Sequence, residues 1–213
     1  MIKAIFFDFD GTISDAKKIA EDSLILTLDK FGYEYDKKKA FKLLGIKMRL
    51  MLKELGIDIR DVEKIREIFY GYFIKMAKEG KIRQCVSLKP LWKIKRDIPL
   101  IVVSNSDIDF LMISIKTLKI EGLFDRIYGA EKKIQKDEIL RRLFEEMRIS
   151  PREAIYVGDR FSDIKFARKI GCIAIAIHNK CSFSTLEEIK REKPNFIVKN
   201  FYELKKILEK LNN

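Results

Sequence analysis

Five consecutive residues near the start of the chain, Asp8-Phe9-Asp10-Gly11-Thr12, follow directly on the apolar run Ile5-Phe6-Phe7. The run predicts a short buried strand, so two carboxyl groups, a glycine and a hydroxyl come at the carboxyl end of that strand. Two acids crowded at such a point repel each other. Their proximity is explained if a divalent cation lies between them and an anionic substrate lies beside it. Taken alone, the pattern also fits a polar turn in which Gly11 adopts a positive φ and Thr12 caps the next helix.

Length and composition limit the class of protein. The 213 residues can form one large domain, or a core with a smaller insert. Cys85, Cys172 and Cys181 are odd in number and form no CxxC pair, so we expect reduced, buried thiols. No apolar stretch approaches the roughly 20 residues that span a bilayer, and acids follow the N-terminus too soon for a secretory signal. The sequence thus predicts a cytoplasmic protein without a membrane segment.

The chain is basic, with a formal net charge of +12 from 44 Lys and Arg against 32 Asp and Glu. Such a charge attracts nucleic acid, acidic membranes or small phosphorylated metabolites. The basic residues are dispersed among acids, however, as at Lys37-Lys38-Lys39 and Lys205-Lys206, and no nucleic-acid recognition motif is present. We therefore interpret the charge as a solvated surface and do not expect nucleic acid as a partner.

Short apolar runs alternate with helix-length amphipathic segments, which is typical of a parallel α/β sheet. The predicted strands are Ala4-Phe9, Leu100-Ser104, Arg126-Tyr128, Ala154-Val157, Ile173-Ile177 and Phe196-Val198. The helices predicted between and after them are Ile108-Leu118, Asp137-Met147, Asp163-Ile170, Ser184-Arg191 and Tyr202-Leu211.

The first strand is followed by a stretch with almost only helical patterns. These predicted helices are Lys17-Phe31, Lys37-Leu43, Arg49-Leu55 and Val62-Lys78. In the last of them Ile65, Phe69 and Phe73 recur at a spacing of four, which we interpret as packing. We predict that residues 16–86 form a helical insert able to cover the carboxylate turn as a lid, and that residues 1–15 and 87–213 form the α/β core.

Further polar residues follow other predicted strands, at the sheet edge where open parallel sheets bind ligands. Ser104-Asn105 comes after one strand and Gly158-Asp159 after another, so Asp159 is a candidate third oxygen ligand. Asp163 either contacts the metal or caps a helix, and both remain open. One lysine among Lys132, Lys133 and Lys136 would supply a fixed positive charge for a phosphate oxygen.

Four segments in chain order resemble the four motifs of the haloacid dehalogenase-like hydrolase superfamily, and the resemblance covers essentially the whole chain. The segments are Asp8-Phe9-Asp10-Gly11-Thr12, Ser104-Asn105, a lysine before a helix, and Gly158-Asp159-Arg160-Phe161-Ser162-Asp163. The resemblance implies a Rossmann-like core with an inserted helical cap of the C1 type. The segment Leu44-Gly45-Ile46-Lys47-Met48-Arg49 is similar to the substrate-facing cap loop of phosphoglycolate phosphatase-like members, so Lys47 and Arg49 are candidate contacts for an anionic group of the substrate.

Two departures from the family pattern concern the third motif and the cap boundary. No proline follows any of the three lysines, and we choose Lys136 because Lys136-Asp137-Glu138-Ile139-Leu140 resembles the lysine-then-helix spacing of members without prolines. The usual proline-glycine before the second core helix is also missing near Ser87-Pro90.

The resemblance implies a Mg²⁺-dependent phosphatase that acts on a small phosphorylated metabolite. Asp8 would attack phosphorus to form an aspartyl-phosphate, and Asp10 would act as general acid and then as general base. Asp8, the backbone carbonyl of Asp10 and Asp159 would hold the Mg²⁺. The groups implied to hold phosphate oxygens are Thr12, Ser104, Asn105 and Lys136.

Two alternatives remain at this point. A phosphomutase of the same superfamily has the same first motif and differs in whether the cap admits water. A receiver-type signalling module also gathers acids, a hydroxyl and a lysine around Mg²⁺, but it is much shorter, and its phosphorylated aspartate lies well inside the chain.

Overall fold

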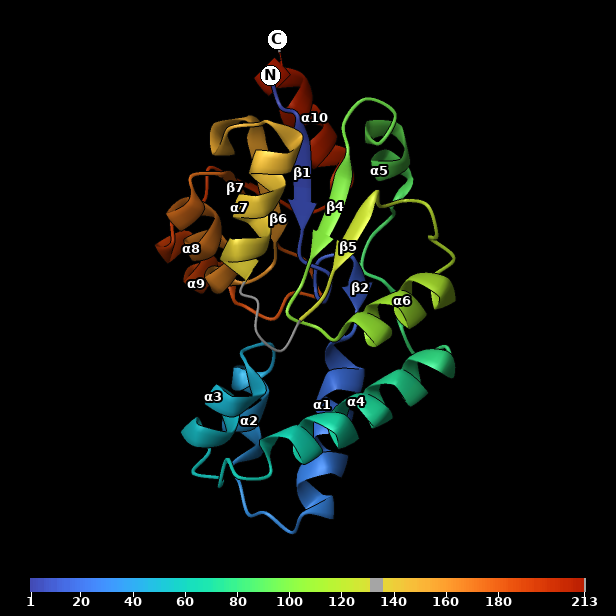
Figure 1. Cartoon of the computed structure of the whole chain (residues 1–213), viewed down its shortest axis with the longest axis vertical. Helices are drawn as coiled ribbons and strands as arrows, with labels where there is room; N and C mark the ends of the chain where they lie inside the picture. Colours follow the sequence, from blue (N-terminus) through green and yellow to red (C-terminus); the bar gives the residue numbers. More distant parts are fainter. Residues whose placement is uncertain (131–135, 213) are drawn as a thin grey trace.

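The computed structural model describes residues 1–130 and 136–212. Within them, six parallel strands form one sheet in the order β5-β4-β1-β6-β7-β8 (Figure 1). The strands of this sheet are β1 (Ala4–Phe7), β4 (Leu100–Val103), β5 (Arg126–Tyr128), β6 (Ala154–Gly158), β7 (Ile173–Ile177) and β8 (Phe196–Val198). The predicted α/β fold with a parallel sheet is confirmed.

Helices cover both faces of the sheet, because successive side chains of each strand point to opposite faces. Ile5 and Phe7 of β1 pack with α5 (Lys89–Ile94), α6 (Ile108–Thr117) and α10 (Phe201–Asn212). Phe6 of the same strand belongs to a second apolar cluster, on the opposite face. The helices contributing to that cluster are α7 (Lys136–Met147), α8 (Phe161–Ile170) and α9 (Leu186–Arg191).

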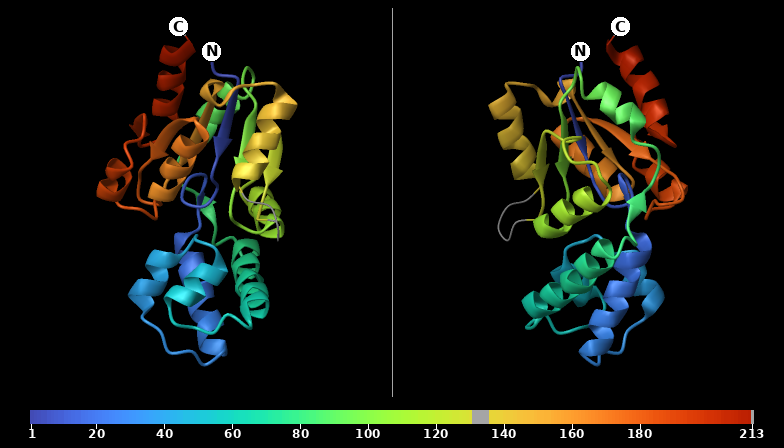
Figure 2. Two further views of the ribbon diagram at one scale, coloured as in Figure 1. Left: turned by 60° about the vertical axis from the view of Figure 1, so that its left-hand side comes forward. Right: turned by 90° about the vertical axis from the view of Figure 1, so that its right-hand side faces the viewer.

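A separate group of helices lies at the end of the sheet toward which the strands point (Figures 1 and 2). This helical block consists of α1 (Lys17–Lys30), α2 (Lys37–Leu43), α3 (Met48–Glu54) and α4 (Val62–Lys78). The ring of Phe73 in α4 stacks on Phe110 of α6 with centroids 3.8 Å apart, which joins the block to the sheet layer. Phe69 and Phe73 of α4 are buried in the apolar core, as expected.

Both chain connections to the helical block pass through a short antiparallel ribbon. It pairs β2 (Ser14–Asp15) with β3 (Arg83–Gln84). The sequence did not predict this ribbon, the helix α5 or the 3-10 turn Pro151–Glu153, because none of them shows a continuous apolar run or an extended helical spacing of apolar residues. The predicted boundaries after residues 15 and 86 stay a prediction.

Element ends differ from the prediction by at most two residues. The first strand stops at Phe7 instead of Phe9, because the carbonyl of Phe9 already accepts from the N–H groups of Ile13 and Ser14 in a tight turn. The helix predicted from Ser184 begins at Leu186, since the Thr185 hydroxyl caps it by accepting from the N–H of Glu188.

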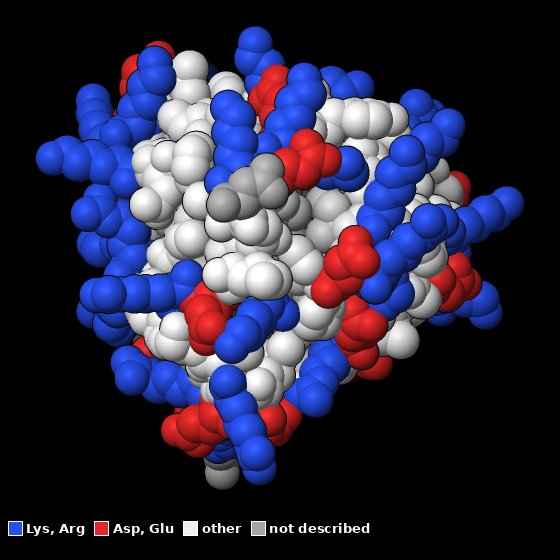
Figure 3. All heavy atoms as spheres, turned by 90° about the horizontal axis from the view of Figure 1, so that it is seen from above, with Lys and Arg blue, Asp and Glu red and all other residues white. Residues whose placement is uncertain are grey.

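Charge is spread over the surface as the sequence suggested. On the face seen from above in Figure 3, lysine and arginine side chains surround the rim and acidic side chains lie among them. The cysteines Cys85, Cys172 and Cys181 are buried and unpaired. In the described part of the chain, no helix combines the length and the apolar character that crossing a bilayer requires.

Candidate active site

A cavity of about 420 Å³ is lined by residues at the carboxyl ends of the strands and by residues of the helical block. The sheet side contributes Asp8, Asp10 and Ser104, among others. The opposite side includes residues 44–47, which connect α2 to α3, and Arg49 of α3. The structure thus brings Lys47 and Arg49 to the same cavity as the first motif, while their role remains a prediction.

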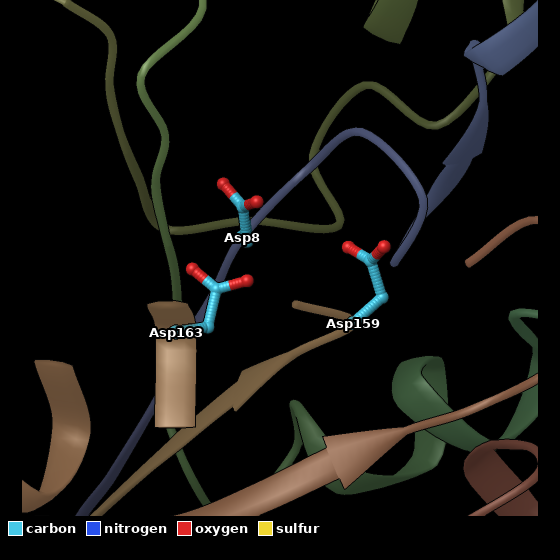
Figure 4. A group of neighbouring side chains, drawn as sticks. All are labelled: Asp8, Asp159 and Asp163. Carbon is cyan, nitrogen blue, oxygen red and sulfur yellow. The ribbon is translucent and has the colours of Figure 1, made fainter. Parts of the chain in front are cut away.

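Three carboxyl groups form a cluster at this end of the sheet (Figure 4). Asp8 directly follows β1, Asp159 directly follows β6, and Asp163 lies in the first turn of α8. All three side chains are buried, and one oxygen of each lies within 4.8 Å of the others. Because β1 and β6 are neighbours and parallel, their ends bring together residues that are far apart in sequence.

Two glycines permit this close approach. Gly11 has a φ of +82°, and a Cβ there would lie 2.6 Å from Cγ of Asp159. A Cβ on Gly158 would lie 2.5 Å from Cγ of Asp163. Larger residues would push either carboxyl group away, so both glycines are part of the site.

The charges of the three buried carboxyl groups are only partly balanced, because one ammonium, that of Lys136, lies within 4 Å of both Asp8 and Asp163, and no described Lys or Arg forms an ion pair with Asp159. Burial raises the pKa of Asp159 to about 8, with Arg160 opposing the shift and the charges of Asp163 and Asp8 adding to it. Burial and the charge of Asp8 raise the pKa of Asp163 to about 6. A divalent cation would favour the ionised forms, and carboxylate oxygens are the ligands that hard cations take. The residues present therefore fit a metal centre.

Asp163 fits both interpretations that the sequence left open. Its Oδ2 accepts a hydrogen bond of 3.2 Å from the backbone N–H of Arg160 at the start of α8. Its Oδ1 lies in the carboxyl cluster, 3.5 Å from Nζ of Lys136. One oxygen serves the helix end and the other faces the site.

Lys136, the first residue of α7, supplies a buried positive charge. Its Nζ lies 3.1 Å from Oδ1 of Asp8 and donates a hydrogen bond of 2.9 Å to the hydroxyl of Tyr156. Burial lowers the pKa of Lys136, but the neighbouring charges, that of Asp8 first, raise it by more, so the ammonium stays protonated. The alternative lysines, Lys132 and Lys133, lie outside the described residues.

Asp10 is half-buried and accepts from two hydroxyl donors. Its oxygens accept from Ser14 Oγ at 2.9 Å and from Ser106 Oγ. Burial raises the pKa of Asp10 to about 6 in spite of the hydrogen bond from Ser106, and the charge of Asp8 adds to the shift. A carboxyl group with this pKa can both give and take a proton near neutral pH.

The predicted phosphate-binding side chains differ in whether they reach the cavity. Ser104 and Asn105 line the cavity, and Ser104 Oγ accepts from the N–H of Ser106 at 3.1 Å. Thr12 is fully buried, and its hydroxyl donates to Oδ1 of Asp159 at 3.2 Å. The structure therefore brings Thr12 to the carboxyl cluster and not to the cavity wall.

Several residues of the site were missed from the sequence. Tyr156 lies in the middle of buried β6, where a phenol needs a partner, and its hydroxyl donates to the carbonyl of Val103 at 3.0 Å while it accepts from Lys136. That polar group in an otherwise apolar run was the available signal. Ser14 and Arg160 carried weaker signals, a hydroxyl and a charge each placed next to a motif.

Comparisons with known proteins agree on one family. The model of the family "Haloacid dehalogenase-like hydrolase" matches residues 5–177. The chain is 27% identical to a Caldanaerobacter subterraneus protein named "Putative pyrophosphatase PpaX", over 98% of this chain and 95% of that one. It is 30% identical to the phosphoglycolate phosphatase of Aquifex aeolicus, over 80% of this chain and 82% of that one. The crystal structure of "a predicted phosphatase from Clostridium acetobutylicum" has a similar fold, with a TM-score of 0.83, 24% identity and coverage of 98% of this chain and 99% of that one.

Proposed function

The chain belongs to the haloacid dehalogenase-like hydrolases, and we propose that it is a Mg²⁺-dependent phosphatase that cleaves a small phosphate monoester through an aspartyl-phosphate. The proposal rests above all on Asp8, which lies in the cavity with Lys136 at 3.1 Å and two further acids beside it. The relatives named as a phosphoglycolate phosphatase and a putative pyrophosphatase support hydrolysis of a phosphoryl group as the reaction class.

In the first step, Asp8 is the nucleophile. A carboxylate oxygen of Asp8 forms a bond to phosphorus while the bond from phosphorus to the leaving oxygen breaks. Asp10 gives its proton to that oxygen, which leaves as an alcohol. A pKa of about 6 keeps part of the Asp10 population protonated near neutral pH, as this role requires.

In the second step, water releases the phosphate. Asp10, now ionised, accepts a proton from water as the water oxygen attacks phosphorus. The bond from phosphorus to the Asp8 oxygen breaks, so inorganic phosphate leaves and the Asp8 carboxylate is restored. Asp10 regains its proton in this step and is ready for another turnover.

Other side chains hold the transferred group. Lys136 offers a positive charge beside the Asp8 oxygen, and Ser104 and Asn105 offer polar groups on the cavity wall. Asp8, the backbone carbonyl of Asp10 and Asp159 would hold the Mg²⁺, with Asp163 beside them. When bound, the ion supplies the positive charge that lets a carboxylate approach an anionic phosphate. Thr12 supports this arrangement indirectly, through its hydrogen bond to Asp159.

The substrate's remaining part extends toward the helical block, which we propose acts as the cap of residues 16–86. Lys47 and Arg49 line that side of the cavity and are candidate contacts for an anionic group of the substrate. A cap over the site limits its substrates to small molecules and keeps bulk water away from the reacting phosphate.

The test is release of inorganic phosphate from p-nitrophenyl phosphate and from a panel of phosphorylated metabolites. We expect turnover with Mg²⁺, none after EDTA, and recovery when Mg²⁺ is returned. Asp8→Asn should abolish turnover, whereas Asp97→Asn, the same change at an exposed aspartate before β4, should leave it intact.

Three outcomes would contradict the proposal. Wild-type activity in Asp8→Asn would exclude this nucleophile, and undiminished activity after chelation would exclude the metal. Transfer of phosphate to a second position of the substrate without its release would indicate a phosphomutase.

A further inference from the structure

Arg160 connects the fourth motif to the opposite wall of the cavity. The residue follows Asp159 and precedes α8, and its guanidinium carbon lies 4.0 Å from the centre of the Phe183 ring. Phe183 in turn donates its backbone N–H to Oδ2 of Asp159 at 2.7 Å. One face of the guanidinium is thus held on a ring that is itself fixed to the carboxyl cluster.

The other side of the guanidinium contacts the helical block. Gly45 lies between α2 and α3 with a φ of +86°, and a Cβ there would lie 2.8 Å from Nε of Arg160. The backbone at Gly45 therefore packs directly against the guanidinium group, and a side chain there would force the guanidinium to move. Arg160 is held between Phe183 on the core side and Gly45 on the cap side.

This arrangement leaves the hydrogen-bonding edge of Arg160 unused. Among the described residues, no Asp or Glu oxygen lies within ion-pair distance of Arg160, and none of its guanidinium N–H groups has a hydrogen-bond acceptor. Arg66, another cavity residue, differs because its guanidinium is paired with Asp107 at 2.9 Å. Arg160 thus offers the cavity an orientated guanidinium that forms no ion pair with a described residue, and its charge also acts at longer range on Asp159 and Asp163.

We propose that Arg160 determines specificity by binding an oxyanion on the leaving group of the substrate. The preferred substrates are then phosphate monoesters whose alcohol part carries a carboxylate or a second phosphate. The guanidinium is stacked in place before substrate arrives, so little side-chain entropy is lost when its N–H groups bind the anion. This inference rests on the proposed phosphatase function, and it assigns the selectivity to a core residue in addition to the cap.

A matched pair of ligands tests the inference without turnover. In the Asp8→Asn background, calorimetry measures the Kd of 2-phosphoglycolate and of ethyl phosphate, which lacks the carboxylate. We expect Arg160→Gln to raise the Kd of 2-phosphoglycolate by about tenfold more than the Kd of ethyl phosphate, a difference that equals about 1.4 kcal/mol. Arg160→Lys keeps the charge and should lose less. Arg152→Gln removes an exposed arginine at the opposite end of β6 and should leave both constants unchanged.

Each result decides the matter. Equal weakening of both ligands by Arg160→Gln would overturn the inference, since Arg160 would then only support the fold of the site. An Arg160→Lys loss as large as that of Arg160→Gln would also overturn it, because the charge would not be what binds. If wild-type protein hydrolysed no phosphate ester but these binding ratios held, the proposed reaction would fail and the anion site would stand.

Discussion

Replacing the Asp159 carboxylate should stabilise the metal-free protein while removing a ligand of the proposed metal centre. Its side chain is 0% exposed and accepts from the N–H of Phe183 and the hydroxyl of Thr12. It makes no ion pair with a described Lys or Arg. Asn has the same shape and can keep both contacts, accepting from Phe183 and donating to Thr12, but it does not ionise.

The size of the effect follows from the pKa. In the folded, metal-free protein, burial raises the pKa of Asp159 from 3.8 to about 8 against the opposing charge of Arg160. Between these values the folded state keeps a proton that the unfolded chain has lost, so the free energy of unfolding falls as pH rises. The stabilisation that the proton on Asp159 gives the folded state is complete below about pH 4 and is lost by about pH 8. Between these values the free energy of unfolding falls by about 1.4 kcal/mol per pH unit. Between pH 5 and 8 the loss is about 4 kcal/mol, or about 10 °C in Tm.

Thermal unfolding in EDTA at pH 5 and pH 8 measures this difference. We expect the Tm of Asp159→Asn, relative to wild type, to be about 10 °C higher at pH 8 than at pH 5. The exposed Asp97→Asn should show no such change. At pH 8, saturating Mg²⁺ should raise the Tm of wild type by more than that of Asp159→Asn, because ligands stabilise the state that binds them. An Asp159→Asn protein that melts below wild type at pH 8 in EDTA would refute the inference of an uncompensated buried charge.

Further predictions concern the acid, the lysine and the turn. The Asp10 carboxyl group must be protonated to help the leaving oxygen, and its pKa is about 6, so kcat/KM for an alkyl phosphate should fall as pH rises above 6. The fall should be weaker for p-nitrophenyl phosphate, which needs less help, and a profile identical for both esters would contradict the assignment. Tyr156→Phe removes a hydrogen-bond partner of Lys136 and should lower kcat by about tenfold with little change in KM, whereas unchanged steady-state kinetics would show that the phenol has no part in positioning. Gly11→Ala places a Cβ 2.6 Å from Cγ of Asp159 at a φ of +82°, so it should destabilise the protein by more than about 1 kcal/mol in urea unfolding; an unchanged midpoint would count against the close approach.

Local sequence patterns were enough for the layout of the fold. The strands Arg126–Tyr128 and Ile173–Ile177 and the helix Val62–Lys78 were predicted with the bounds that the structure has. Continuous apolar runs and the spacing of three and four are properties of neighbouring residues, so the sequence displays them directly. The ribbon of β2 and β3 was missed because its pairing depends on residues almost 70 positions apart.

The site was predictable only as far as the strand ends allow. Parallel strands carry their carboxyl ends to one edge, so polar residues after β1, β4 and β6 had to meet there. From this rule the sequence alone predicted that Asp8, Ser104 and Asp159 lie at the same edge of the sheet. The rule could not predict that the Thr12 hydroxyl donates to Asp159, because the partner of a side chain depends on atoms that another strand supplies.

The parallel α/β layout and the gathering of the acids at one edge follow from patterns within the chain, since apolar periodicity and motif order act along it. Tertiary structure alone decided the surroundings of each group: the Tyr156 hydroxyl on Lys136, and Arg160 held between Phe183 and Gly45. Burial and the nearby charges also set the pKa values of Asp10, Asp159 and Asp163. Contacts, burial and electrostatic fields depend on distances through space, and segments remote in sequence set these distances only when the chain is folded.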